Sequence, residues 1–122
     1  MDHRQLVRML SAGRVVVGAA LTIAPGLTGK MWVGAAAEAP ATKLAFRTMG
    51  IRDLALGAGT LHALATGEPA RSWVLLSAVS DGVDAAATAL ALRKIPLRAS
   101  IPAIAVATLA AAVGTIAVER LD

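Results

Sequence analysis

Four long apolar segments alternate with shorter links along the chain. They run over about 6–24, 41–66, 73–92 and 100–118. Each is close to the ~20 residues that a membrane-spanning helix needs. Proline and glycine end the first two segments, and a basic stretch that leads to Pro96 ends the third. The pattern predicts an all-α protein: a four-helix transmembrane bundle with antiparallel neighbours, forming one domain over residues 1–122.

The fourth segment gives the clearest evidence for a membrane. Ile101–Val118 carries no charge, and its only side-chain polar atoms are the hydroxyls of Thr108 and Thr115. A surface helix of a water-soluble bundle would carry a polar stripe on one side. The longer link between Pro25 and Pro40 contains three glycines and Trp32, and we expect it to lie at the membrane interface, where tryptophan is favoured.

Composition strengthens this interpretation. Hydrophobic residues make up 57% of the chain and charged residues 16%, against roughly 45–50% and about 25% in a typical soluble domain. The absence of cysteine excludes a disulfide framework and cysteine-based metal or redox chemistry. A net charge of +4 would favour nucleic acid in a soluble protein, but here the basic residues stand mainly at the ends of apolar runs. We therefore expect the lipid bilayer, and no nucleic acid, as a partner.

Two aspects of topology stay open. A signal peptide is an alternative for the first segment, although Arg14 interrupts its apolar run and the small-residue stretch at 35–39 lies far from that run. With four spans, the two sides would carry four and five basic residues: Arg4, Arg8, Arg71 and Arg120 against Lys30, Lys43, Arg93, Lys94 and Arg98. This difference is too small to set the orientation by the positive-inside rule, and dual topology is also compatible with it.

Charged residues inside the apolar segments are the informative ones. Each costs at least ~2.5–3.5 kcal/mol at the centre of a membrane helix, so it is expected to face the bundle interior and to have a partner there. On the third segment the polar residues recur at helical spacing: Ser77, Asp81, Asp84 and Thr88. The first segment has a similar stripe of Ser11, Arg14, Gly18 and Thr22. The second has two, namely Thr48, Arg52, Ala55, Gly59, His62 and Thr66, and Gly50, Asp53, Gly57 and Thr60.

Antiparallel threading brings the charges of the first three helices to one level. The sequence predicts a buried cluster of Arg14, Arg52, Asp53, Asp81 and Asp84, with Ser77, Thr88 and His62 as further candidate members. Two arginines face three aspartates, so a proton on one carboxyl, a bound cation or His62 must balance the charge. The cluster either only fixes helix packing or forms a ligand, ion or catalytic site. Gly18, Gly50, Gly57 and Gly59 are predicted to allow close helix approach.

Familiar site motifs are weak or absent. Residues 26–30 (Gly-Leu-Thr-Gly-Lys) resemble part of a phosphate loop, but Ala24 and Met31 stand where that motif needs glycine and a hydroxyl residue. Two histidines are too few for a histidine metal site, and no serine has a clear histidine and aspartate arrangement. We predict no metal, no cofactor and no identifiable catalytic residue.

The run from Arg47 to Gly57 (Arg-Thr-Met-Gly-Ile-Arg-Asp-Leu-Ala-Leu-Gly), with the later aspartates of the third segment, resembles small four-helix membrane proteins of the DoxX-like kind that carry a Gly-x-Arg-Asp signature. The resemblance rests on Gly50, Arg52, Asp53 and Gly57. It implies a multi-pass bundle in the bacterial inner (plasma) membrane and little about activity.

The expected function is therefore that of a small integral membrane protein that binds a partner or serves as an accessory subunit, without enzymatic activity. Its partner would be a small apolar ligand or another membrane protein, and a homodimer is compatible with the sequence. Two alternatives stay open: a proton-coupled small-molecule transporter, and a membrane hydrolase or isomerase that uses the aspartates and arginines.

Overall fold

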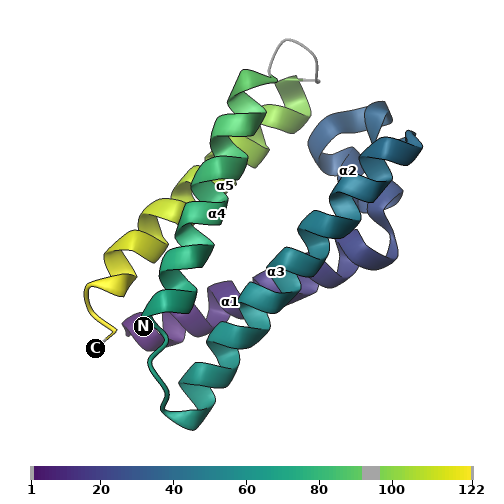
Figure 1. The fold of residues 1–122 in the computed structure, drawn as a ribbon. Coiled ribbons are helices and arrows are strands. Elements are labelled where there is room, and N and C mark those ends of the chain that lie inside the picture. Colours follow the sequence, from purple (N-terminus) through teal and green to yellow (C-terminus); the bar gives the residue numbers. More distant parts are fainter. Residues whose placement is uncertain (1, 92–96, 122) are drawn as a thin grey trace.

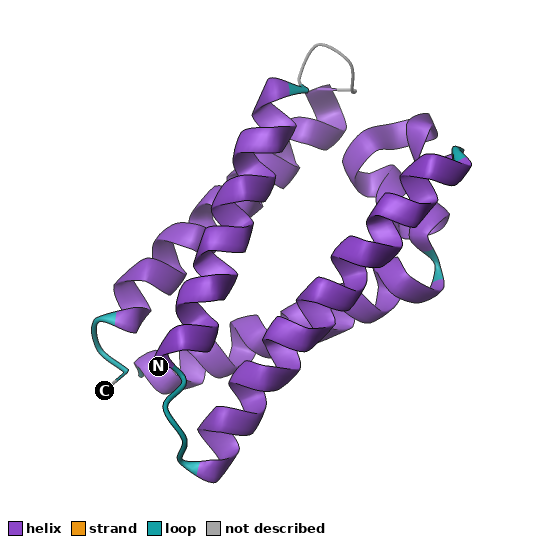
Figure 2. Cartoon of the chain, viewed as in Figure 1, coloured by secondary structure: helices purple, strands orange, loops and turns teal. Residues whose placement is uncertain are grey.

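The computed structural model describes residues 2–91 and 97–121. All regular structure within these residues is helical (Figure 2), as the apolar pattern predicts. The elements are α1 (His3–Ile23), α2 (Pro25–Val33), the short 3-10 helix η1 (Gly34–Glu38), α3 (Pro40–Thr66), α4 (Arg71–Leu90) and α5 (Leu97–Val118). The bounds of α1, α3, α4 and α5 agree with the four apolar segments to within a few residues. Arg93 and Lys94, which entered the charge comparison, lie outside the described residues.

The described chain has five α-helices rather than the four expected, because the long link after α1 is itself helical. Pro25 occupies the first turn of α2, where its missing N–H costs no hydrogen bond. Gly34, with φ 66°, ends α2 in a backbone conformation that favours glycine. Proline and glycine thus start and stop a helix here.

Local signals fix the ends of the longer helices. Asp2 caps α1 with a capping box, in which its Oδ1 accepts a hydrogen bond from the Gln5 N–H at 2.7 Å and the Gln5 side chain accepts one from the Asp2 N–H at 3.0 Å. Pro40 stands in the first turn of α3. Gly67, in the left-handed conformation with φ 76°, ends α3 and turns the chain towards α4.

Two helix pairs make up the molecule (Figure 1). α1 packs mainly on α3, and α4 packs mainly on α5. The α1–α3 pair is antiparallel and close, since a Cβ on Gly50 would lie 2.7 Å from the Gly18 oxygen and a Cβ on Gly57 would lie 2.8 Å from the Ser11 oxygen. Only glycine permits this approach of two helix backbones.

The buried apolar residues form two clusters at opposite ends of the helix pairs. The terminal cluster, near both chain ends, consists of Val7, Ala63, Leu64, Ala70, Val74, Ala117, Val118 and Leu121. The α2 cluster consists of Leu21, Ala37 and Phe46, with Trp32, Val33 and Met49 packed against it. The middle of the molecule therefore lacks a large apolar core of its own among the described residues.

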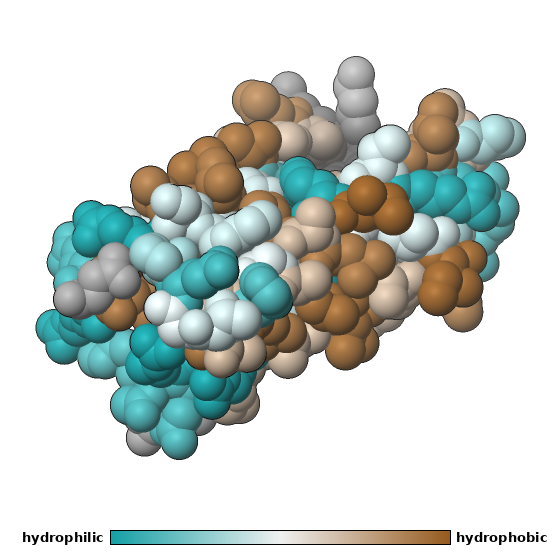
Figure 3. Space-filling view, turned by 60° about the horizontal axis from the view of Figure 1, so that its bottom comes forward, coloured by the Kyte–Doolittle hydropathy of each residue, from teal (hydrophilic) through white to brown (hydrophobic). Residues whose placement is uncertain are grey.

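Large apolar side chains cover the outside of the helices instead. Ile23 is 80% exposed, Met31 81% and Leu90 91%, and Figure 3 shows apolar residues across the middle of the molecule with hydrophilic residues mainly towards its two ends. α1 and α4 are long and apolar enough to cross a membrane by length and composition. A core helix of a soluble protein would pass the same test, but only 22% of either span is buried. Both helices therefore turn most of their surface outward.

Candidate functional site

Five charged side chains from three helices meet between the two apolar clusters. We call this set the ion network: Arg14 of α1, Arg52 and Asp53 of α3, and Asp81 and Asp84 of α4. Carboxylates and guanidiniums alternate through it in the order Asp81, Arg14, Asp53, Arg52, Asp84. The structure thus brings together the five charges that the helical stripes single out.

Arg14 joins α1 to both other helices. Its Nη1 donates to Asp53 Oδ1 at 3.0 Å, and its Nη2 donates to Asp81 Oδ2. The two carboxylates therefore flank the same guanidinium. Because Gly18 lets α1 lie directly on the backbone of α3, Arg14 reaches Asp53 one turn before this contact.

Arg52 closes the network from the other side. Its Nη1 and Nη2 donate to the two oxygens of Asp84 at 3.2 and 2.7 Å, which is the bidentate geometry that makes arginine–carboxylate pairs strong. Its Nη2 also lies 3.4 Å from Asp53 Oδ1. Arg52 Nε is buried and has no hydrogen-bond partner among the described residues.

Burial separates these contacts from ordinary surface ion pairs. The side chains of Arg14 and of the three aspartates are 11–13% exposed, and that of Arg52 is 36% exposed. Exposed ion pairs contribute little, whereas removal of one partner from a buried pair leaves a costly uncompensated charge. The ion network therefore couples the positions of α1, α3 and α4.

Two carboxylate oxygens of the ion network remain free. Asp53 uses only Oδ1 and Asp81 only Oδ2 in the hydrogen bonds of the described residues. Neither Asp53 Oδ2 nor Asp81 Oδ1 is a fully enclosed atom without a partner. Both oxygens therefore remain accessible as hydrogen-bond acceptors.

A cavity of about 550 Å³ opens beside the ion network, and α1, α2, α3, α4 and α5 all contribute to its lining. Arg14, Asp53, Asp81 and Asp84 line its charged side, whereas Arg52 is not among the lining residues. The remaining wall is mostly apolar, with Leu21, Val74, Ala107, Ala110 and Gly114 among its residues. A volume of this size lies within the ~300–1,000 Å³ range of pockets for small ligands. The cavity therefore combines an apolar wall with a charged floor.

The predicted polar neighbours lie at different distances from the ion network. Ser77 lines the cavity, but its hydroxyl donates to the Trp73 carbonyl at 2.9 Å. Thr88 accepts a hydrogen bond from Trp32 Nε1 at 3.1 Å and donates to the Asp84 carbonyl at 2.7 Å. Its role is therefore to connect α2 to α4.

His62 does not join the ion network. It is exposed on α3, about 14 Å along the helix axis from Asp53, and has no ion pair with the described carboxylates. His62 therefore cannot supply the balancing charge. The network keeps three carboxylates against two guanidiniums, and a proton or a bound cation must provide the balance.

The predicted packing glycines serve two different contacts. Gly18, Gly50 and Gly57 line the α1–α3 interface, whereas the Trp73 ring of α4 packs against the position of a Cβ on Gly59. The sequence analysis did not assign Thr28 or Trp32 to the site, although both line the cavity from α2. Because α2 itself was not predicted, no helical spacing could relate these residues to the aspartates.

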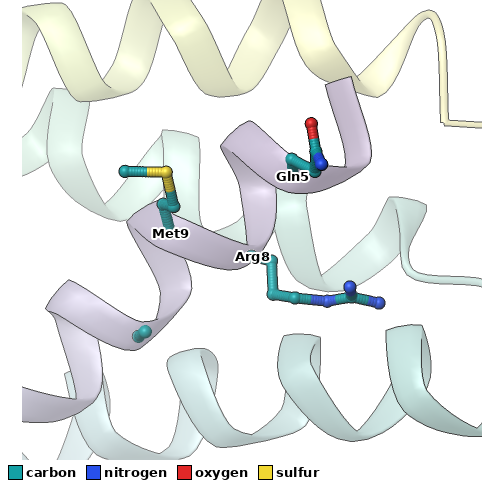
Figure 4. A pocket seen from close by; sticks show the side chains of 4 residues that line it. Gln5, Arg8 and Met9 are labelled. Atoms are coloured by element: carbon teal, nitrogen blue, oxygen red, sulfur yellow. The ribbon is translucent and has the colours of Figure 1, made fainter. Parts of the chain in front are cut away.

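A second hollow lies on the outside of α1 and is lined by Gln5, Arg8, Met9 and Ala12 (Figure 4). All four residues are exposed and come from one helix, and the labelled side chains point in different directions. The hollow brings no converging polar groups together and is not a candidate site.

A separate polar group lies at the start of α3, away from the cavity. Glu38 forms ion pairs with Lys43 at 3.2 Å and with Lys30 at 3.6 Å. The hydrogen bond and the charge of Lys43, assisted by Lys30, hold the pKa of Glu38 below its ordinary value of 4.5. This group connects the end of α2 to the start of α3.

The arrangement is suited to binding more than to metal chemistry. The described residues contain no group of three or more histidine, cysteine, aspartate or glutamate side chains that could hold a metal ion. Comparison of the chain with protein-family models, with curated proteins and with solved structures found no match. The geometry of the ion network and the cavity is therefore the basis for the functional assignment.

Proposed function

We propose that this chain is a small multi-pass protein of the bacterial inner membrane, related to the DoxX-like kind, that binds a small amphipathic ligand without transforming it. In this proposal α1, α3, α4 and α5 form a four-helix membrane bundle and α2 lies at one interface. The observation that carries the proposal is the cavity of about 550 Å³, whose apolar wall ends on a buried ion network.

The exposed surface supports the membrane part of the proposal. Large apolar residues cover the outer faces of α1, α4 and α5, including Val16, Leu76 and Leu109, which are 68%, 56% and 66% exposed. Exposed apolar area of this extent marks a surface that meets lipid or protein rather than water. The predicted membrane charges also lie inside, where partners offset their cost.

The cavity supports the binding part. A network that served only to fix packing would be expected to use its hydrogen-bonding groups on itself. Here two carboxylate oxygens stay free beside a space that apolar residues line. This combination fits a ligand with an apolar body and one polar group.

The membrane part can be tested by expression in bacteria, followed by separation of the membranes and an alkaline carbonate wash. We expect the protein to stay with the washed membranes and to need detergent for release. Recovery in the soluble fraction as a folded monomer would contradict the proposal.

The binding part can be tested with the protein's own fluorescence. The chain has two tryptophans, of which Trp32 lines the cavity and Trp73 does not. In the Trp73→Phe variant, a ligand in the cavity is expected to change the emission of Trp32 and to raise Tm. Substituting Trp32 instead gives the matched control, in which the stabilisation persists and the fluorescence response is lost.

Proton-coupled transport is the second candidate, because the network carries one more carboxylate than guanidinium. A carboxyl that exchanges a proton for a substrate would use this excess. The test is uptake into proteoliposomes under a pH gradient. Flux that depends on the gradient and is lost in Asp81→Asn would favour transport, whereas binding without flux would favour the binding protein.

A further inference from the structure

We propose that the ligand of the cavity is a lipophilic ammonium, a protonated amine attached to a compact apolar body, and that the free oxygens of Asp53 and Asp81 bind its N–H groups. This inference rests on the proposed function and names the chemical class that the cavity selects.

Charge determines the sign of the ligand. Of the five members of the ion network, the four that line the cavity are three aspartates and one arginine, because Arg52 is not part of the lining. The one lining guanidinium, that of Arg14, already donates through Nη1 and Nη2 to Asp53 and Asp81. An anion would meet mostly carboxylates, whereas a monovalent cation would restore neutrality to a network with one carboxylate in excess.

Hydrogen bonding determines the kind of cation. Asp53 Oδ2 and Asp81 Oδ1 belong to carboxylates on either side of the Arg14 guanidinium, and both lack a donor among the described residues. An ammonium with N–H groups can donate to both. A quaternary ammonium cannot donate, and it is usually bound by several aromatic faces. Trp32 is the only aromatic residue in the lining, so the site favours primary and secondary amines.

The walls determine the rest of the molecule and its route. Val74, Ala107 and Ala110 offer no side-chain hydrogen bond, so the body beyond the ammonium is apolar. Other lining residues are well exposed, with Val17 at 48% and Val106 at 68%. These exposed apolar residues form a mouth that faces the bilayer in the proposed orientation, and an amphipathic amine can enter from there.

The experiment compares four probes with the same adamantane body on the detergent-purified Trp73→Phe protein. They carry an aminomethyl, a trimethylammoniomethyl, a hydroxymethyl or a carboxylate group, and methylammonium serves as a fifth probe without the apolar body. The amine is protonated at pH 7, as a lysine side chain is. Affinity is read from Trp32 emission and from calorimetry.

We expect the amine to bind about tenfold or more tightly than the alcohol, because a charged hydrogen bond adds more than a neutral one. The trimethylammonium compound and methylammonium are expected to bind at least about tenfold more weakly than the amine, and the carboxylate not to bind. Equal binding of amine and alcohol, or preferred binding of the carboxylate, would overturn the inference and leave the binding function intact. Failure of all probes to bind would overturn both.

The variant Asp81→Asn tests the assigned residue. It keeps the size of the side chain and removes the charge, and it should abolish the preference for amine over alcohol while leaving alcohol binding unchanged. Glu68→Gln is the matched control, since Glu68 is an exposed carboxylate outside the cavity lining. An unchanged amine preference in folded Asp81→Asn would contradict the role of Asp81, and the probe series on the parent protein remains decisive if this variant does not fold.

Discussion

Asp53 has a special position among the three carboxylates of the ion network. It contacts both guanidiniums through one oxygen, at 3.0 Å from Arg14 and at 3.4 Å from Arg52. Asp81 and Asp84 each contact one arginine. Loss of the charge at Asp53 therefore weakens the neutralisation of two buried cations, whereas loss at Asp81 affects one.

We predict that Asp53→Asn lowers the stability of the folded protein more than Asp81→Asn does. Removal of one partner from a buried pair costs about 3–5 kcal/mol, and Asp53 serves two pairs. Asp81→Asn also removes the carboxylate in excess, which offsets part of its loss. Thermal unfolding in detergent measures both, with Glu68→Gln as the surface control. Equal Tm values for Asp53→Asn and that control would contradict a stabilising network.

The ion pairs of Glu38 predict a pH dependence at a different position. Because its pKa is lowered on folding, Glu38 contributes stability above its ordinary value of 4.5, and this contribution is lost as pH falls through the lowered value. The Tm difference between the parent and Glu38→Gln should be small, present near about pH 6 and absent in strong acid. A difference that grows as the pH falls would have the wrong sign.

The sequence could predict the members of the ion network but not its pairing. Helical spacing places Arg14, Asp53, Asp81 and Asp84 on inward faces, and membrane energetics requires partners for them. Which arginine meets which aspartate depends on the distance between helix axes, which the glycines set. His62 was a wrong candidate for the balancing charge, because the stripe that contains it turns outward towards the end of α3.

Among the helices, the α1–α3 pair depends most on backbone contact. A Cβ on Gly50 would lie 2.6 Å from Thr22 Oγ1 and 2.7 Å from the Gly18 oxygen. One of these atoms belongs to the backbone of α1 and cannot rotate away. The pair must therefore separate to accept any side chain at this position.

We predict that Gly50→Ala destabilises the protein by several kcal/mol or prevents its assembly, as overpacking of a close interface does. Gly82→Ala is the matched control on α4, where a Cβ would meet nothing within 4 Å. This control should be neutral or stabilising by about 0.5–1 kcal/mol, because alanine is the better helix former. Tm and the elution profile in detergent measure both, and equal effects of the two substitutions would contradict the proposed close packing.

At the scale of helices, the four long segments were predictable and α2 with η1 was not. A span of ~20 apolar residues is a strong signal, whereas the nine residues of α2 contain two glycines and a proline that usually mark a loop. The contacts of Trp32 with Phe46 and Thr88 help to hold α2 in place. Such tertiary contacts are invisible to local pattern.

The molecule as a whole holds its helix pairs together at the two ends and leaves room between them. The terminal cluster and the α2 cluster supply the apolar contacts, and the cavity lies beside the ion network in the middle. A molecule built in this way can lose or fill its cavity without losing its fold.

We therefore predict that Ala107→Phe on α5, which places a ring in the cavity, reduces ligand binding strongly and leaves Tm equal or higher. The exposed neighbour Thr108 gives the control Thr108→Phe, which adds the same ring outside the cavity lining. Retained binding in Ala107→Phe, measured by Trp32 emission, would place the ligand elsewhere.

The distribution of the network over three helices also constrains how such a protein is made. α1 leaves the ribosome first, carrying the Arg14 guanidinium and no acidic residue of its own. The carboxylates that neutralise it stand on α3 and α4, which are synthesised later. In a bilayer, α1 would wait with an uncompensated charge worth ~2.5–3.5 kcal/mol until those helices arrive. A nascent chain stalled after α1 should therefore remain bound to the insertion machinery, and release should come only when Asp53 has entered the membrane.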